Sequence, residues 1–199
     1  MSNQRANYNK QISDTSIRIG EVRFSYAYVI NPRVNPTDGT SKYSVQILVP
    51  KTDALAKQLL DHAIEAAVQN GIATKFGGKR PVPAKLKLPL RDGDEEFPDD
   101  PVYAGMWFFN ATSATDRRPG VRVLELGQLV EPLDAEDFYS GCWGAAVVNF
   151  FPYAVSGNMG VAAGLNNIIK TRDDDRLGGG SHSPEADFND LIAGGSVLD

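Results

Sequence analysis

Several short segments of this chain alternate between apolar and polar side chains, and this period of two restricts the fold more than any other feature. Residues 22–30 (VRFSYAYVI) and 43–49 (YSVQILV) both follow it. Because successive side chains of a strand point to opposite faces, each segment predicts a half-buried strand. The turn-rich residues 31–39 between them predict a hairpin with a long connection. One face of the first strand is expected to carry Val22, Phe24, Tyr26, Tyr28 and Ile30.

One segment has the spacing of an amphipathic helix. Thr52 or Asp53 can cap it, its apolar positions run from Leu55 to Ala67, and Gly71 is a natural stop. Many short strands, one helix and 19 glycines among 199 residues predict a mainly β fold, either a barrel or a sandwich. Further strands are predicted at residues 84–90, 102–111, 121–130, 142–153 and 161–170.

The two ends of the chain differ from its centre. Residues 1–17 are expected to form a flexible N-terminal arm, and residues 18–172 the folded domain. Residues 173–199 are rich in glycine, serine and aspartate, which predicts a disordered acidic C-terminal tail. A small apolar cluster among acids is typical of a partner-docking motif, although a passive tail kept for solubility is the alternative. The motif comprises Asp187, Phe188, Asp190, Leu191 and Ile192.

Charge is distributed unevenly along the chain. The formal net charge is −5, and residues 171–199, with two arginines and seven acidic side chains, account for all of it. Residues 1–90 carry 13 lysines and arginines against 6 acidic side chains, whereas residues 91–100 (RDGDEEFPDD) are strongly acidic. The basic part is compatible with a nucleic-acid partner despite the negative total. The acidic stretch is equally well explained as a solvated loop.

Catalytic chemistry is not indicated. The chain has two histidines and a single cysteine, Cys142, which lies in an apolar strand and is interpreted as an inert core thiol. These are too few for a structural zinc site, and residues 77–80 (GGKR) do not complete a phosphate-loop pattern. We therefore expect no enzymatic activity and no cofactor or metal. A polar N-terminus and no long apolar run predict neither a signal peptide nor a membrane span.

Aromatic and basic residues occur close together along the predicted strands and loops. Unpaired bases expose flat faces on which aromatic side chains stack whatever the sequence, while lysine and arginine bind the phosphates. Strand aromatics are core residues more often than stacking platforms, and we assign Phe24, Phe108 and Phe150 to the core. The residues predicted to bind single-stranded DNA are Arg18, Arg23, Tyr26, Tyr28, Lys42, Tyr43, Lys79, Arg80, Lys85, Lys87, Trp107, Phe109, Arg117, Arg118, Phe151 and Tyr153.

Three blocks in the second half of the chain resemble one protein family. They are residues 103–121 (YAGMWFFNATSATDRRPGV), 136–153 (EDFYSGCWGAAVVNFFPY) and 156–180 (SGNMGVAAGLNNIIKTRDDDRLGGG), and the early segments RFSYAYV and KYSVQILVPKTD are similar too. The sequence resembles the single-stranded DNA-binding proteins of tailed phages and prophages over about residues 18–180. This resemblance implies an OB-like β-barrel, association into homodimers, and a role in phage DNA replication or recombination.

Together these observations predict a sequence-independent single-stranded DNA-binding protein in the cytoplasm of a bacterial host. Duplex DNA is expected to be at most a weak partner. The acidic tail is expected to compete with DNA for a basic groove and, once displaced, to recruit replication or recombination proteins. The alternative is an oligomeric structural or scaffold protein of the virion, which the β character and glycine content also fit. A metal-dependent nuclease would need more converging carboxylates than the single acidic loop provides.

Overall fold

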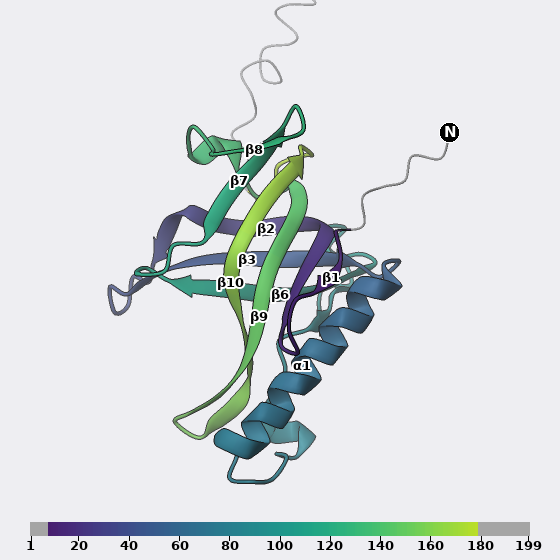
Figure 1. The fold of residues 1–199 in the computed structure, drawn as a ribbon, viewed down its shortest axis with the longest axis vertical. Helices are drawn as coiled ribbons and strands as arrows, with labels where there is room; N and C mark the ends of the chain where they lie inside the picture. The colour runs from purple at the N-terminus through teal and green to yellow at the C-terminus, as the bar shows by residue number, and fades with distance from the viewer. Residues whose placement is uncertain (1–7, 179–199) are drawn as a thin grey trace, which may run out of the picture.

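Five long strands close into a barrel in the computed structural model of this chain (Figure 1). Strand β2 (Ser16–Val34) pairs with β3 (Ser41–Pro50), and β3 pairs with β6 (Met106–Ala114), both antiparallel. A short parallel pairing joins β6 to β10 (Asn158–Arg172), which pairs with β9 (Trp143–Val155), and β9 returns to β2. In barrel order the strands run first, second, third, fifth, fourth. This closed ring confirms the predicted mainly β, OB-like barrel.

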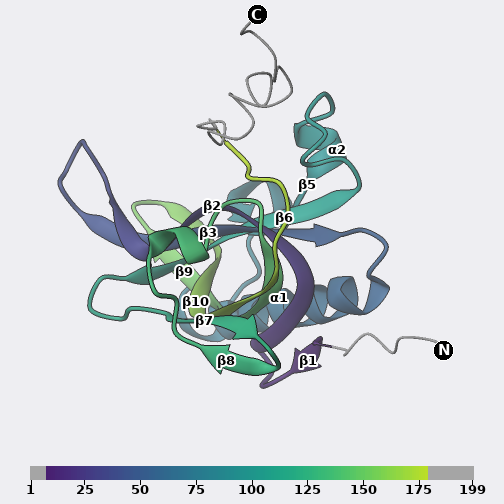
Figure 2. The same ribbon diagram turned by 90° about the horizontal axis from the view of Figure 1, so that it is seen from above.

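The structure describes residues 8–178, and smaller elements surround the barrel in that range. The sequence predicted one helix, and the structure adds a second of only four residues. In Figure 2 this short helix lies beyond β6, on the side away from the long one. The remaining elements are β1 (Lys10–Gln11), α1 (Ala54–Thr74), β4 (Leu86–Lys87), β5 (Arg91–Asp92), α2 (Gly93–Glu96), β7 (Gly120–Glu125), β8 (Gln128–Val130) and two 3-10 turns (Pro83–Lys85 and Ala135–Asp137).

Helix α1 follows the second barrel strand and packs against β9 and β2. The Asp53 carboxylate caps it by accepting a hydrogen bond of 2.9 Å from the backbone N–H of Ala56. The buried stripe includes Ala56, Leu60 and Ala63, whereas Leu55 is exposed. The helix is therefore confirmed, but its apolar stripe begins one residue later than predicted.

The sequence predicted that the helix ends at Gly71, but α1 continues to Thr74. A Cβ atom at Gly71 would lie only 2.2 Å from Cε2 of the Phe76 ring. Glycine at this position therefore allows the chain after the helix to fold back and bury Phe76. No helix in residues 8–178 is long and apolar enough to cross a membrane.

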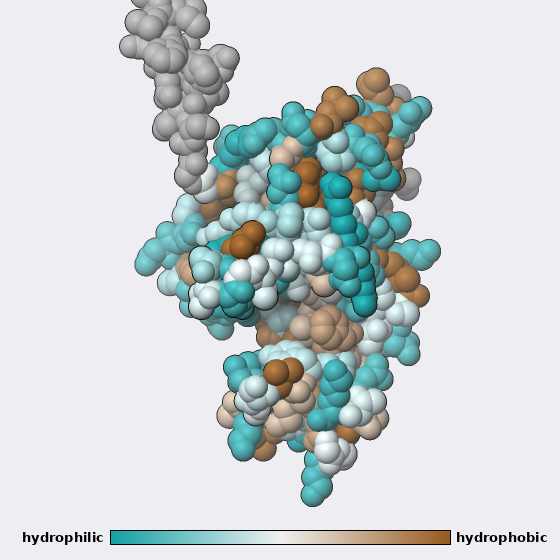
Figure 3. All heavy atoms as spheres, turned by 90° about the vertical axis from the view of Figure 1, so that its left-hand side faces the viewer, coloured by the Kyte–Doolittle hydropathy of each residue, from teal (hydrophilic) through white to brown (hydrophobic). Residues whose placement is uncertain are grey.

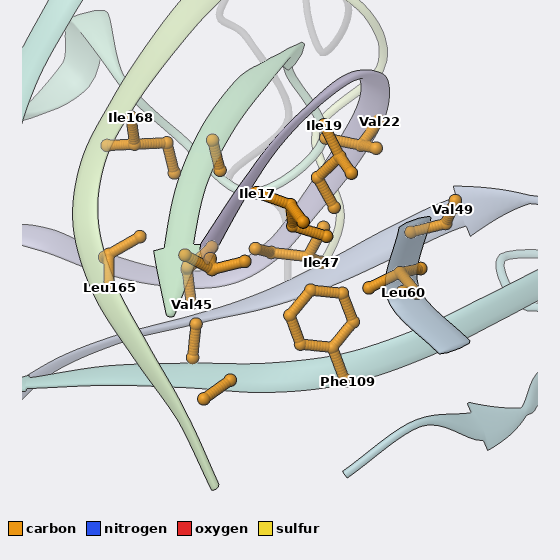
Figure 4. Packing of buried hydrophobic residues seen from close by; sticks show 14 of the residues in the cluster. Ile17, Ile19, Val22, Val45, Ile47, Val49, Leu60, Phe109, Leu165 and Ile168 are labelled. Carbon is orange, nitrogen blue, oxygen red and sulfur yellow. The ribbon is translucent and has the colours of Figure 1, made fainter. Parts of the chain in front are cut away.

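The barrel interior is filled by aliphatic and aromatic side chains from all five barrel strands and from α1 (Figure 4). Phe109 lies at its centre, surrounded by residues such as Ile47, Leu60 and Leu165. A second, smaller cluster of Leu48, Tyr103 and Phe108 lies apart from this core. Since Leu48 and Phe108 alternate with core positions on β3 and β6, the second cluster sits on the outer face of these strands, under the segment that carries β5 and α2.

Residues 173–178, which we had assigned to the tail, lie against the folded domain. The backbone N–H of Leu177 donates to the Ser140 carbonyl at 2.8 Å, and its side chain packs on the second cluster. The indole of Trp143 donates to the Asp174 carboxylate at 2.6 Å. The chain thus reaches residue 178 along the surface of the barrel. The predicted docking motif, Asp187 to Ile192, lies outside the described residues.

Candidate nucleic-acid interface

The outer faces of β3 and β6 carry a row of polar side chains. On β3, Val45, Ile47 and Val49 point into the core, so that Lys42, Ser44 and Gln46 alternate with them on the outside. The register places Ser44 opposite Thr112 and Gln46 opposite Asn110. In an OB barrel this face of the second and third strands is the one that binds oligonucleotides. Figure 3 views the molecule from the side on which the β2–β3 connection projects in Figure 1, and it shows a hollow between an upper body and a lower projection.

A β-bulge in β2 brings two tyrosines to this surface. Tyr26 has a backbone φ of +46°, and the pairing of β2 with β3 shifts register between Ser25 and Tyr28. The alternation therefore changes phase: Val29 is buried instead of Tyr28. The prediction that Tyr26 and Tyr28 share a face with Val22 and Phe24 was wrong, because a bulge inserts one extra residue. As a result Tyr26 and Tyr28 are 58% and 38% exposed.

The backbone around Tyr26 is held in place by a segment far away in the sequence. The N–H of Ala27 donates to the Ser140 hydroxyl at 3.1 Å, and the N–H of Gly141 donates to the Phe24 carbonyl at 2.7 Å. A bulky residue in the left-handed region costs on the order of 1–3 kcal/mol, and such strain is concentrated at functional sites. The bulge, together with its exposure, makes the Tyr26 ring a candidate for a functional role.

Two hollows flank these tyrosines. The first, which we call the tyrosine hollow, has a volume of about 450 Å³ and is lined by Tyr26, Tyr28, Asp100, Tyr103 and Leu177, among others. The second, the cationic hollow, has a volume of about 350 Å³. Its lining includes Tyr26, Tyr28, Arg33, Lys42, Ser44, Asn110 and Thr112. Because Tyr26 and Tyr28 line both hollows, the two lie next to each other, and we refer to them together as the groove.

The cationic hollow combines flat rings with positive charge. The Arg33 guanidinium lies 5.6 Å from the centre of the Tyr28 ring, close enough for a cation–π interaction. Lys42 and Arg33 face each other across the β2–β3 pairing. This arrangement can stack bases on the rings while the cations bind the adjacent phosphates.

Other predicted basic and aromatic residues line neither hollow of the groove. Arg117 and Arg118 are exposed in the connection between β6 and β7. Phe151 is exposed on the β9–β10 hairpin, where Lys87 pairs with Gly160 and donates to the Asn158 side chain at 2.8 Å. Lys79 lies in the loop after α1, Lys85 ends the 3-10 turn that contacts β10, and Tyr153 on β9 is half-buried. In Figure 1 the loop after α1 and the β9–β10 hairpin both lie in the lower part of the molecule.

The structure places four predicted residues away from the groove. Phe109 is 0% exposed and packs on Phe150, with 5.8 Å between ring centres, and Tyr43 is also buried. The Trp107 ring lies beneath two ammonium groups, 4.6 Å from Lys51 and 5.0 Å from Lys57. Arg80 forms a bidentate ion pair with Glu65. The rings of Phe109 and Tyr43 offer no face to a base in this arrangement, so we leave them out of the proposed site.

Two further predicted arginines hold the chain ends against the barrel. Arg18 donates to the Tyr8 carbonyl at 2.7 Å, and Arg23 donates to the carbonyls of Gly141 and Asp175 at 3.0 and 2.9 Å. Both side chains therefore have structural partners within the described part of the chain. Burial raises the pKa of the Cys142 thiol to about 11, which agrees with the predicted inert core thiol.

The acidic stretch after residue 91 packs over the second apolar cluster and is held there by ion pairs and hydrogen bonds. Lys51 forms ion pairs with Asp92 and Asp94, which lower the pKa of both carboxyls and raise the pKa of Lys51. Asp94 also accepts a hydrogen bond of 2.8 Å from the backbone of Gly105. These contacts hold the segment over the second apolar cluster, where Phe97 stacks on Tyr103 with 4.4 Å between ring centres.

Sequence reasoning missed several residues of the groove. Arg33 lies in the segment that was predicted to be a turn, although β2 extends through it to Val34. The groove also contains three small polar residues whose type alone does not indicate DNA binding, namely Ser44, Asn110 and Thr112. The sequence did contain a signal for Ser44 and Asn110, since each alternates with a core position on a predicted strand, whereas Thr112 lies just after the predicted strand 102–111.

Comparison with known proteins identifies the family. A family model described as the ssDNA-binding protein of Enterobacter phage Enc34 matches residues 15–197. The chain belongs to this family. The match confirms the resemblance to phage single-stranded DNA-binding proteins that we drew from the sequence blocks.

Three known proteins are similar to this chain over most of their length. The structure of the single-stranded DNA-binding protein from bacteriophage Enc34 in complex with ssDNA is 30% identical, with a TM-score of 0.73, over 88% of this chain and 96% of that one. Putative protein p50 of Acyrthosiphon pisum secondary endosymbiont phage 1 is 29% identical over 184 residues, 88% of this chain and 93% of the relative. The single-stranded DNA-binding protein gp2.5 of bacteriophage T7 shares the fold, with 16% identity, a TM-score of 0.55, and coverage of 96% and 99%.

Proposed function

We propose that this chain binds single-stranded DNA without reading its sequence and acts in phage DNA replication or recombination in the cytoplasm of the bacterial host. The observation that carries this proposal is the exposed pair Tyr26 and Tyr28 beside Arg33 and Lys42, on the barrel face that OB folds use for oligonucleotides. A member of the same family has been solved in complex with ssDNA, at 30% identity to this chain.

The chemistry of the groove favours single strands. Bases that are not paired can turn their flat faces onto Tyr26 and Tyr28, and such stacking contributes about 1–3 kcal/mol per base whatever the sequence. Arg33 and Lys42 then neutralise phosphates on one side of the rings. Arg117 and Arg118 extend the positive charge along the path of the DNA strand. In a duplex the bases are stacked on each other, so duplex DNA would gain only the phosphate contacts.

We also propose that the acidic tail competes with DNA for this groove. Leu177 and Gly178 line the tyrosine hollow, so the chain leaves the described residues at the groove itself. Residues 179–199 contain four acidic side chains and neither lysine nor arginine. Their charge is opposite to that of the cationic hollow, which favours occupation of the groove when DNA is absent. Displacement by DNA would free the motif around Phe188 to recruit replication or recombination proteins.

Association into a homodimer belongs to the same proposal. Three leucines on the β7–β8 hairpin and the loop after it are largely exposed, namely Leu126, Leu129 and Leu133. Apolar side chains exposed together are typical of a protein interface. Analytical ultracentrifugation of the chain with and without oligonucleotide measures the oligomeric state directly, and a monomer at all concentrations would contradict a dimer.

Fluorescence anisotropy of labelled oligo-dT, compared with a labelled duplex of the same length, tests the main proposal. We expect tight binding of oligo-dT that weakens as salt rises, and weaker binding of the duplex. Anisotropy is preferred to intrinsic fluorescence because Trp107 and Trp143 line neither hollow of the groove. A virion scaffold protein would bind neither probe.

The tail is tested by deleting residues 179–199, which leaves every described residue in place. Competition predicts tighter binding of oligo-dT by the shortened chain, with the largest gain at low salt, because the attraction between tail and groove is electrostatic. Equal affinity of the two chains would contradict the competition but not the DNA binding.

A further inference from the structure

The tyrosine hollow differs from the rest of the groove in the charge that lines it. Asp100 borders it together with Tyr26 and Tyr103, whereas Arg33 and Lys42 border the cationic hollow and not this one. Asp99, also exposed, precedes Asp100 in the sequence. A carboxylate repels phosphate, so the DNA backbone is expected to follow the cationic hollow, and a base is the part of a nucleotide that can enter the tyrosine hollow.

The remaining lining suits a flat, partly apolar group. The exposed Tyr26 ring offers a face for stacking, and Val102 and Leu177 supply apolar surface. The Tyr103 hydroxyl donates to the Gln46 side chain at 2.6 Å, and the Ser140 hydroxyl accepts from the N–H of Ala27. The Tyr103 hydroxyl as a donor and the Ser140 hydroxyl as an acceptor thus hold the walls of the hollow.

Asp100 retains the capacity to accept a further hydrogen bond. One of its carboxylate oxygens accepts from the N–H of Val102 at 2.9 Å, a contact that fixes the side chain at the edge of the hollow. Among residues 8–178, the other oxygen has no hydrogen-bond or ion-pair partner. A carboxylate in this position can receive an N–H group of a base but not a carbonyl oxygen.

We propose that the tyrosine hollow is a pocket for one nucleobase, and that Asp100 favours bases with an exocyclic amino group over thymine. This inference rests on the proposed function, and it adds one position of base preference to an otherwise sequence-tolerant groove. Cytosine presents N4–H₂ at the edge where thymine presents the acceptor O4. With the base stacked on Tyr26, the Asp100 carboxylate accepts from cytosine and repels the thymine oxygen.

The test compares labelled oligo-dC and oligo-dT of equal length by anisotropy, using the full chain and two variants that each remove one negative charge. Asp100→Asn keeps an oxygen for the Val102 N–H, so the loop is preserved, but its amide can donate to thymine O4 as well as accept from cytosine. Asp99→Asn is the matched control, because Asp99 does not line the hollow. A single charged hydrogen bond at a solvent-accessible site corresponds to about a three- to tenfold effect.

The measured quantity is the ratio of the dC affinity to the dT affinity. We expect Asp100→Asn to lower this ratio by about three- to tenfold relative to the wild type, and Asp99→Asn to leave it unchanged. An unchanged ratio in Asp100→Asn would overturn the proposal, as would an equal gain for both oligonucleotides in the two variants, since Asp100 would then only repel phosphate. Wild-type chain that binds neither oligonucleotide would refute the proposed function itself.

Discussion

Replacement of Tyr26 is expected to affect the free energy of unfolding and the affinity for DNA differently. Its φ of +46° is unfavourable for any residue with a Cβ atom, and its ring is 58% exposed. Replacement by glycine removes strain of about 1–3 kcal/mol. It also costs about 0.5–1 kcal/mol of backbone entropy and roughly 1 kcal/mol of partial ring burial. The free energy of unfolding of Tyr26→Gly should therefore lie within about 1 kcal/mol of the wild type, or about 2–4 °C in Tm.

Tyr26→Ala provides the internal comparison. Alanine loses the same ring but keeps the unfavourable φ, so it should be less stable than the glycine variant by about 1 kcal/mol. At an ordinary strand position the order is reversed, since glycine is there the less stable residue by about 0.5–1 kcal/mol. Urea denaturation of the two variants measures this difference, and an alanine variant more stable than the glycine variant would refute the assigned backbone strain.

The same two variants should lose affinity for single-stranded DNA. Loss of one stacking partner corresponds to about 1–3 kcal/mol, or between about 5- and 150-fold in Kd for oligo-dT. Tyr26→Phe, which retains the ring, should bind nearly as tightly as the wild type. Anisotropy titration at fixed salt measures all three variants. Unchanged affinity of Tyr26→Gly in a folded protein would refute the stacking role of Tyr26.

Three further predictions concern separate parts of the structure. Gly71→Ala should lower the free energy of unfolding by about 1–3 kcal/mol in urea, because the added Cβ would overlap the buried Phe76 ring; wild-type stability would contradict this packing. Arg33→Gln should reduce the slope of log affinity for oligo-dT against log salt by about 0.7, the value for one phosphate contact on a single strand, whereas an unchanged slope would place Arg33 off the DNA path. Because Lys51 lowers the pKa of the Asp92 and Asp94 carboxyls in the folded state, their stabilising contribution is present above the pKa of these carboxyls in the unfolded chain and is lost as the pH falls through their lower, folded-state values. Lys51→Gln should therefore flatten the acid side of the stability profile measured by thermal unfolding at several pH values, and an equally steep decline would contradict the pairing.

The sequence alone determined the class of fold and the kind of partner. Alternation in residues 22–30 and 43–49, helical spacing after Asp53, and the scarcity of histidine and cysteine are local properties that can be read without a structure. The separation of basic and acidic residues was likewise visible, and the sequence blocks of the second half identified the family. These features could be predicted from the sequence because each depends on residues that are near one another along the chain.

Only the tertiary structure decided which aromatic residues face the solvent. The bulge that turns Tyr26 and Tyr28 outward depends on hydrogen bonds to Ser140 and Gly141, more than 100 residues away in the sequence. A shift of one residue exchanges the two faces of a strand, so a local pattern cannot reveal it. Barrel closure through β6 and β10 similarly buries Phe109. The partner could thus be inferred from composition and pattern, whereas the binding surface followed from contacts between distant segments.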